Sequence, residues 1–88
     1  MICKRVIYSG HVQGVGFRIT AFQVAQRHAV AGFVRNLPDG TVELLAEGEP
    51  AQVDSFLADV RSLMGAYIQS ADIQEECDCR RTGFQILH

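Results

Sequence analysis

Residues 10–18, which read Gly-His-Val-Gln-Gly-Val-Gly-Phe-Arg, combine residue types that could bind an anion. Glycine permits tight turns and allows successive backbone N–H groups to face one point, an arrangement that favours a negative charge. The segment leads from a strand-like stretch into a helix-like one, so the positive end of a helix dipole adds to the attraction. Arg18 supplies a planar set of donors that matches a phosphate or carboxylate. We therefore interpret this segment as a phosphate-binding loop.

A tight connection with a purely structural role is the alternative interpretation of the same segment. Arg18 favours the binding interpretation, because a cation at a helix N-terminus opposes the dipole at a cost of roughly 0.3–1 kcal/mol unless an anion lies there. The segment lacks the Gly-Lys-Ser/Thr ending of a Walker loop and the glycine spacing of a dinucleotide-binding fold. His11, in the same loop, is interpreted as a histidine that faces solvent.

The composition excludes several functional classes. The chain has 88 residues, of which 48% are apolar, enough for one domain over residues 1–88 with one modest core. Its net charge of −2 argues against a nucleic-acid partner, which usually requires a basic face. No apolar run approaches the roughly 20 residues that span a membrane, and no signal sequence is recognisable. We expect a cytoplasmic monomer.

The cysteines, three in number, do not form a disulfide framework. Cys77 and Cys79 could contribute to a metal site, but no second pair of thiols or nearby histidine completes one, and reduced thiols on a strand are favoured. Whether Cys3 pairs with either of them under oxidation stays open. We expect no metal and no cofactor.

The periodicity of apolar residues predicts two helices and five strands. The strands are expected at 3–9, 32–36, 41–47, 67–77 and 84–87, with helices at 17–28 and 50–64. The order β-α-β-β-α-β with a short C-terminal strand is that of the α+β, ferredoxin-like split βαβ fold. Right-handed crossovers then place both helices on one face of a mixed sheet.

A second pattern extends from Gly32 to Gly48 and includes Asn36 at the end of a strand, beside the turn Leu37-Pro38-Asp39-Gly40. An asparagine in that place is most often a turn residue. The sequence does not determine whether Asn36 reaches the loop at 10–18.

Together the two patterns resemble a known family. Gly10-x-Val12-Gln13-Gly14-Val15-x-Phe17-Arg18 resembles the first signature of the acylphosphatases, and the segment from Gly32 to Gly48 is similar to the second. The element order and the closing Phe84-x-Ile86 extend the resemblance over nearly the whole chain. The C-terminal sequence Ile86-Leu87-His88 departs from relatives that carry a basic residue in the last strand, so its contribution to the site stays open.

The resemblance implies roles for particular residues. It implies that Asn36 orients the attacking water and that Arg18 binds the phosphate and takes part in catalysis. The implied phosphate-binding backbone belongs to Gly14, Val15, Gly16, Phe17 and Arg18. The implied reaction is metal-independent hydrolysis of small acyl phosphates, such as acetyl phosphate or 1,3-bisphosphoglycerate, with inorganic phosphate as product and inhibitor.

These residue types suit that chemistry. The leaving group of an acyl phosphate is a carboxylate whose conjugate acid has a pKa of about 4, so it departs without a general acid. Phosphoryl transfer depends mainly on positioning and charge stabilisation. The chain has no Cys-x5-Arg loop and no Asp-x-Asp pair, which excludes the cysteine and aspartyl phosphatase mechanisms. A site of this kind should hydrolyse activated substrates and leave stable phosphate monoesters intact.

Two other functions compete with this one. A non-catalytic anion-binding or regulatory module is the main alternative, since acylphosphatase-like domains occur within larger carbamoyl-handling maturation proteins. The presence of both Arg18 and Asn36, and a chain of 88 residues, favour the free enzyme. An RNA-recognition domain shares the fold class, but the acidic balance and the lack of paired aromatic residues on the central strands argue against it.

Overall fold

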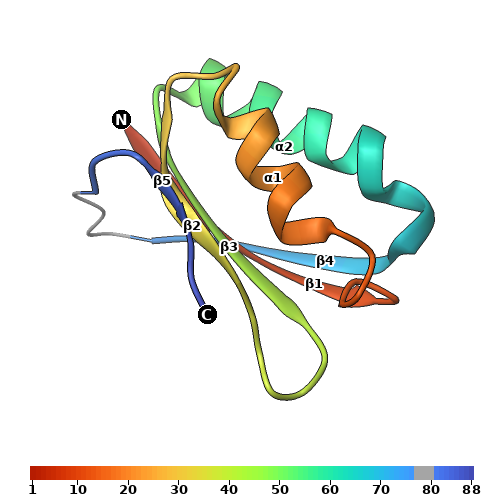
Figure 1. Ribbon diagram of the computed structural model, residues 1–88. Helices are drawn as coiled ribbons and strands as arrows, with labels where there is room; N and C mark the ends of the chain where they lie inside the picture. The colour runs from red at the N-terminus through yellow and green to blue at the C-terminus, as the bar shows by residue number, and fades with distance from the viewer. Residues whose placement is uncertain (77–80) are drawn as a thin grey trace.

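The computed structural model describes residues 1–76 and 81–88, in which two helices pack on one face of a five-stranded sheet (Figure 1). In chain order the elements are β1 (Ile2–Gly10), α1 (Phe17–Ala25), β2 (Val30–Asn36), β3 (Val42–Gly48), α2 (Pro50–Met64), the 3-10 helix η1 (Gly65–Tyr67), β4 (Ile68–Glu75) and β5 (Phe84–Ile86). The strands lie in the order β4-β1-β3-β2-β5, with β5 parallel to β2 and the other neighbours antiparallel. The predicted ferredoxin-like α+β fold is confirmed.

The register of the sheet decides which side chains meet the helices. Residues directly opposite each other on neighbouring strands point to the same face, and the face alternates along each strand. Val6, Leu44 and Val34 form one such row, and all three are fully buried in the core beneath the helices. Arg35 points to the opposite face. Asn36, two residues beyond Val34, therefore lies on the helix side of the sheet.

Helix α2 begins and ends where the sequence predicts. Pro50 occupies its first turn, where the fixed φ of proline suits a helix start, and Gly65 follows its last residue. Val53, Phe56 and Val60 recur at helical spacing and are fully buried against the sheet. Burying one such side chain stabilises the fold by about 1.5–3 kcal/mol.

Helix α1 is shorter than predicted and ends at Ala25 instead of His28. The N–H groups of residues 26–28 bond to carbonyls three residues earlier, at 2.9–3.2 Å, so the chain tightens into a turn. His28 Nε2 then lies 2.8 Å from Asp59 Oδ2 of α2. The contact between His28 and helix α2 thus accompanies the early end of α1.

All five strands also differ from their predicted bounds, by one or two residues at one end or at both. Strand β2 begins at Val30 and not Gly32, because the ladder with β3 continues to the Val30–Gly48 pair. Strand β4 begins at Ile68, since Tyr67 belongs to η1.

The expectations for the cysteines are tested only in part. Cys3, in β1, is 6% exposed and disulfide-bonded. Cys77 and Cys79 lie outside the described residues. Within residues 1–76 and 81–88, no group of three or more His, Cys, Asp or Glu side chains could hold a metal ion. None of the helices described is long and apolar enough to cross a membrane.

Candidate active site

The loop between β1 and α1 leaves the sheet at Gly10. This residue has a φ of 125°, and a Cβ there would lie 2.6 Å from the carbonyl oxygen of Tyr67, so glycine is required. The N–H of His11 donates to the same carbonyl at 2.9 Å, which joins the start of the loop to η1. Val12 and Phe17, 1% and 2% exposed, then anchor both arms of the loop in the core.

The backbone at the tip of this loop alternates in the sign of φ. Gly14 and Gly16 both have a φ of 77°, whereas Val15 between them does not have a positive φ. Such alternation turns successive N–H groups to one side and forms an anion-binding nest. Among the described residues, none of the N–H groups of Gly14, Val15 and Gly16 donates to a protein acceptor. The loop thus has the backbone that the expected phosphate site requires.

Helix α1 begins at Phe17 without a capping side chain. Gly16 is its N-cap, and its first turn contains no acidic residue. The first N–H groups of a helix have no partner within the helix, so they remain available to an anion. The ring of Tyr8 packs on that of Phe17 with centroids 4.9 Å apart, which holds the start of α1 against β1.

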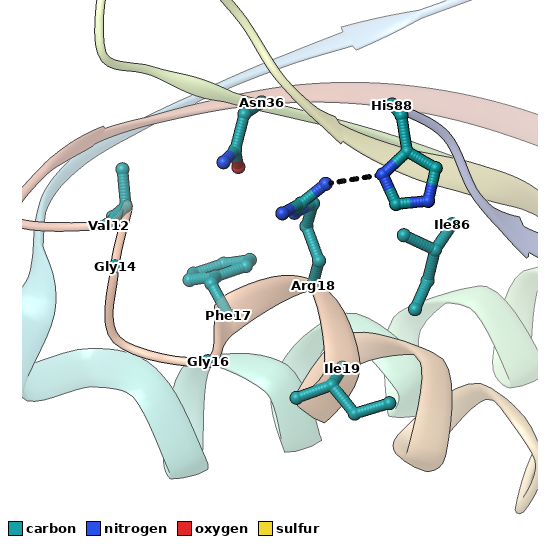
Figure 2. Close-up of a pocket in the computed structure, with 9 residues that line it drawn as sticks. All are labelled: Val12, Gly14, Gly16, Phe17, Arg18, Ile19, Asn36, Ile86 and His88. Atoms are coloured by element: carbon teal, nitrogen blue, oxygen red, sulfur yellow. Dashed lines mark hydrogen bonds between the residues drawn. The ribbon is translucent and has the colours of Figure 1, made fainter.

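The side chains of Arg18 and Asn36 point into the same space above Phe17 (Figure 2). Arg18 comes from the first turn of α1, and Asn36 is the last residue of β2. The pocket has a volume of about 260 Å³ and is lined by Val12, Gly14, Gly16, Phe17, Arg18, Ile19, Asn36, Ile86 and His88. The fold therefore brings together two side chains whose proximity the sequence left undetermined.

Arg18 keeps its charge available. Its Nη1 lies 3.4 Å from the carbonyl oxygen of Leu87 and 3.4 Å from Nδ1 of His88, both long for a hydrogen bond. Within the described part of the chain, no carboxylate forms an ion pair with Arg18. The side-chain amide of Asn36 likewise has no hydrogen-bond partner among those residues. The pocket thus contains a cation, helix N–H groups and a neutral amide, all available to a ligand.

The residues predicted for the site differ in whether they line the pocket. Those that line the pocket are Gly14, Gly16, Phe17, Arg18 and Asn36. Val15 does not line it, because its side chain packs against the core, so only its backbone can serve. The sequence interpretation missed Ile19 and left the contribution of the C-terminal residues open, and Ile86 and His88 line the pocket. Parallel pairing of Val34 with Ile86 brings them to the pocket.

Comparisons with known proteins identify the family of this chain. The family model of acylphosphatase matches residues 4–86. The chain is 41% identical to an acylphosphatase of Acaryochloris marina over 88 residues, which covers 99% of this chain and 95% of that one. It is also 41% identical to an acylphosphatase of Methanospirillum hungatei, covering 94% of this chain and 96% of the other. The crystal structure of acylphosphatase from Bacillus subtilis is similar with a TM-score of 0.90, at 32% identity over the whole of both chains.

Proposed function

This chain belongs to the acylphosphatase family and hydrolyses acyl phosphates, and we propose that it does so in the pocket between the 10–18 loop and Asn36. The observation that carries the proposal is that Arg18 and the Asn36 amide, neither bound to a carboxylate among the described residues, face one pocket. A non-catalytic anion-binding module is not favoured, because this chain matches acylphosphatases over nearly the full length of both chains.

In this proposal the phosphoryl group binds at the start of α1. Its non-bridging oxygens accept from the guanidinium of Arg18 and from backbone N–H groups of Gly14, Val15, Gly16, Phe17 and Arg18. The uncapped helix end and Arg18 concentrate positive charge that a dianion neutralises. Charge-assisted hydrogen bonds are roughly twice as strong as neutral ones, and they stabilise the charge of the transition state when they are already in place.

Asn36 holds the attacking water in the same scheme. Its amide offers both an acceptor and donors, and being neutral it does not repel the phosphate. The oxygen of water bonds to phosphorus while the bond between phosphorus and the acyl oxygen breaks, and the carboxylate leaves with that electron pair. Both hydrogens of the water end on the phosphate, so an acyl phosphate dianion and water yield a carboxylate and dihydrogen phosphate. The scheme uses no metal ion or cofactor.

The Asn36→Ala variant tests this assignment through the hydrolysis of benzoyl phosphate in the presence of a chelator. We expect kcat to fall by roughly 10²-fold, because the water loses its position. Inhibition by inorganic phosphate should persist, since Arg18 and the loop are intact. If phosphate inhibition is lost instead, Asn36 shapes the loop and does not hold the water.

The proposal also takes residues 1–88 as one domain that acts as a cytoplasmic monomer. One hydrophobic core beneath the two helices supports a single domain. The large exposed apolar residues described come from separate elements, which supports a monomer: Met1, Ile19, Leu63, Tyr67 and Ile73. An acyl phosphate is a dianion that does not cross bilayers unaided, so its hydrolase must share its compartment. Light scattering tests the monomeric state, and cell fractionation tests the cytoplasmic location.

A further inference from the structure

We infer that Gln13 positions Asn36 for catalysis by joining the phosphate-binding loop to the turn between β2 and β3. The inference rests on the proposed role of Asn36 as the residue that holds the water. Gln13 belongs to the loop but does not line the pocket, so it acts through another residue and is a positioning residue.

The side-chain amide of Gln13 donates to two carbonyl groups of the turn. Its Nε2 lies 2.8 Å from the oxygen of Leu37 and 2.9 Å from that of Thr41, so both amide hydrogens are used. Leu37 directly follows Asn36, and Thr41 directly precedes Val42, which pairs with Asn36 in the ladder. The two hydrogen bonds therefore flank the residue pair that ends this ladder.

The turn closes without Gln13. The N–H of Leu37 donates to the oxygen of Thr41 at 2.9 Å, and that of Gly40 donates to the oxygen of Leu37 at 3.1 Å. The carboxylate of Asp39 accepts from the N–H and hydroxyl of Thr41 at 3.0 and 2.6 Å. A carbonyl oxygen has two lone pairs, so both keep a backbone partner when Gln13 is removed. Gln13 therefore adds a link between the turn and the loop.

That link matters for the distance between phosphate and water. Gln13 directly precedes Gly14, at the start of the nest, and it bonds to the residue after Asn36. Attack on phosphorus requires the reacting atoms to lie about 3–3.5 Å apart and in line, and a misplacement of about 1 Å costs roughly 10²-fold in rate. A hydrogen-bonded connection one residue from each group is suited to hold that separation.

The test compares Gln13→Ala and Gln13→Glu with wild type in the full chain, using benzoyl phosphate as substrate and inorganic phosphate as inhibitor. Glutamate keeps the size of the side chain, but its carboxylate cannot donate to the two carbonyls. We expect both variants to lower kcat by roughly 10- to 100-fold. The inhibition constant of phosphate should stay unchanged in Gln13→Ala, whereas the new carboxylate of Gln13→Glu repels the anion and should weaken phosphate inhibition. Gln26→Ala is the matched control and should change neither, because the Gln26 amide donates to Phe22 O at the C-terminal end of α1, away from the turn.

A double variant, Gln13→Ala with Asn36→Ala, separates action through Asn36 from action on the loop. If Gln13 acts through Asn36, the double variant has the kcat of Asn36→Ala alone. A further loss of kcat in the double variant, or weaker phosphate inhibition in Gln13→Ala, would overturn the inference by showing that Gln13 acts on the loop.

The remaining outcomes are also decisive. Wild-type kcat in Gln13→Ala, beside a reduced kcat in Asn36→Ala, would overturn the inference and leave the proposed function standing. Wild-type kcat in Asn36→Ala would overturn the proposed function itself. Loss of cooperative thermal unfolding in both Gln13 variants would show that the turn depends on Gln13 and would overturn the inference as well.

Discussion

Replacing Arg18 with glutamine should stabilise the ligand-free protein while removing most of its activity. Arg18 lies in the first turn of α1, at the positive end of the helix dipole, and no acidic residue accompanies it there. Its contacts with Leu87 O and His88 Nδ1 are both 3.4 Å long, so their loss costs little. Glutamine is shorter than arginine but keeps a polar amide, and it removes the repulsion between charge and dipole.

The expected changes in Tm and in kcat/KM follow from this geometry. A charge at a helix end interacts with the dipole by roughly 0.3–1 kcal/mol. In a domain of this size 1 kcal/mol corresponds to about 4–8 °C, so Tm should rise by about 1–8 °C without phosphate. Two charge-assisted hydrogen bonds at about 1.5–3 kcal/mol each imply that kcat/KM falls by roughly 10²- to 10⁴-fold. KM should rise and kcat fall together, because in the proposed scheme the guanidinium contacts the phosphoryl group in the ground state and in the transition state alike.

Thermal unfolding in chloride buffer, repeated with increasing inorganic phosphate, measures the stability effect. Phosphate should raise the Tm of the wild type by mass action and raise that of Arg18→Gln much less. Arg61→Gln is the matched control, because Arg61 lies in the last turn of α2, where a cation favours the dipole. It should lower Tm by a similar amount and leave hydrolysis unchanged.

A lower Tm for Arg18→Gln in phosphate-free buffer would refute this reasoning, because it would make the guanidinium a structural element. Turnover near the wild-type value would refute its assignment to phosphate binding.

Two further predictions concern the leaving group and the buried carboxylate of Glu43. Benzoyl phosphate should be hydrolysed equally well with and without a chelator, whereas p-nitrophenyl phosphate, a monoester, should react far more slowly. Similar rates for these two substrates would contradict the scheme. Burial raises the pKa of Glu43, but hydrogen bonds from Arg5 and Arg35 outweigh it and hold the pKa below its usual value. The carboxylate therefore stabilises the fold above the unfolded-state pKa of about 4.3, and this contribution is lost as pH falls through the lower folded-state pKa. Glu43→Gln should thus lower the free energy of unfolding at neutral pH by about 1–3 kcal/mol. Urea titrations at several pH values should show that this difference between variant and wild type shrinks in acid. A difference that stays constant with pH would contradict the reasoning.

Features that depend on residues adjacent in the chain could be predicted from the sequence. Pro50 and Gly65 bound α2 because a helix start and a helix end are decided within one turn of chain. Residues 14–18 are consecutive, so the positive φ angles of Gly14 and Gly16 and the position of Arg18 at a helix start depend on local sequence. The end of α1 was misplaced, since the chain tightens there before the contact between His28 and Asp59 of another helix.

By itself, then, the sequence determined the fold class, the family and the local form of the loop at residues 10–18. The tertiary structure decided that Asn36 faces this loop, that Gln13 bonds to the adjacent turn, and that His88 lines the same pocket. The physical reason is that backbone preferences act between neighbours in the chain. Contacts between distant segments depend instead on strand register and on the packing of helices against the sheet, which no single segment encodes.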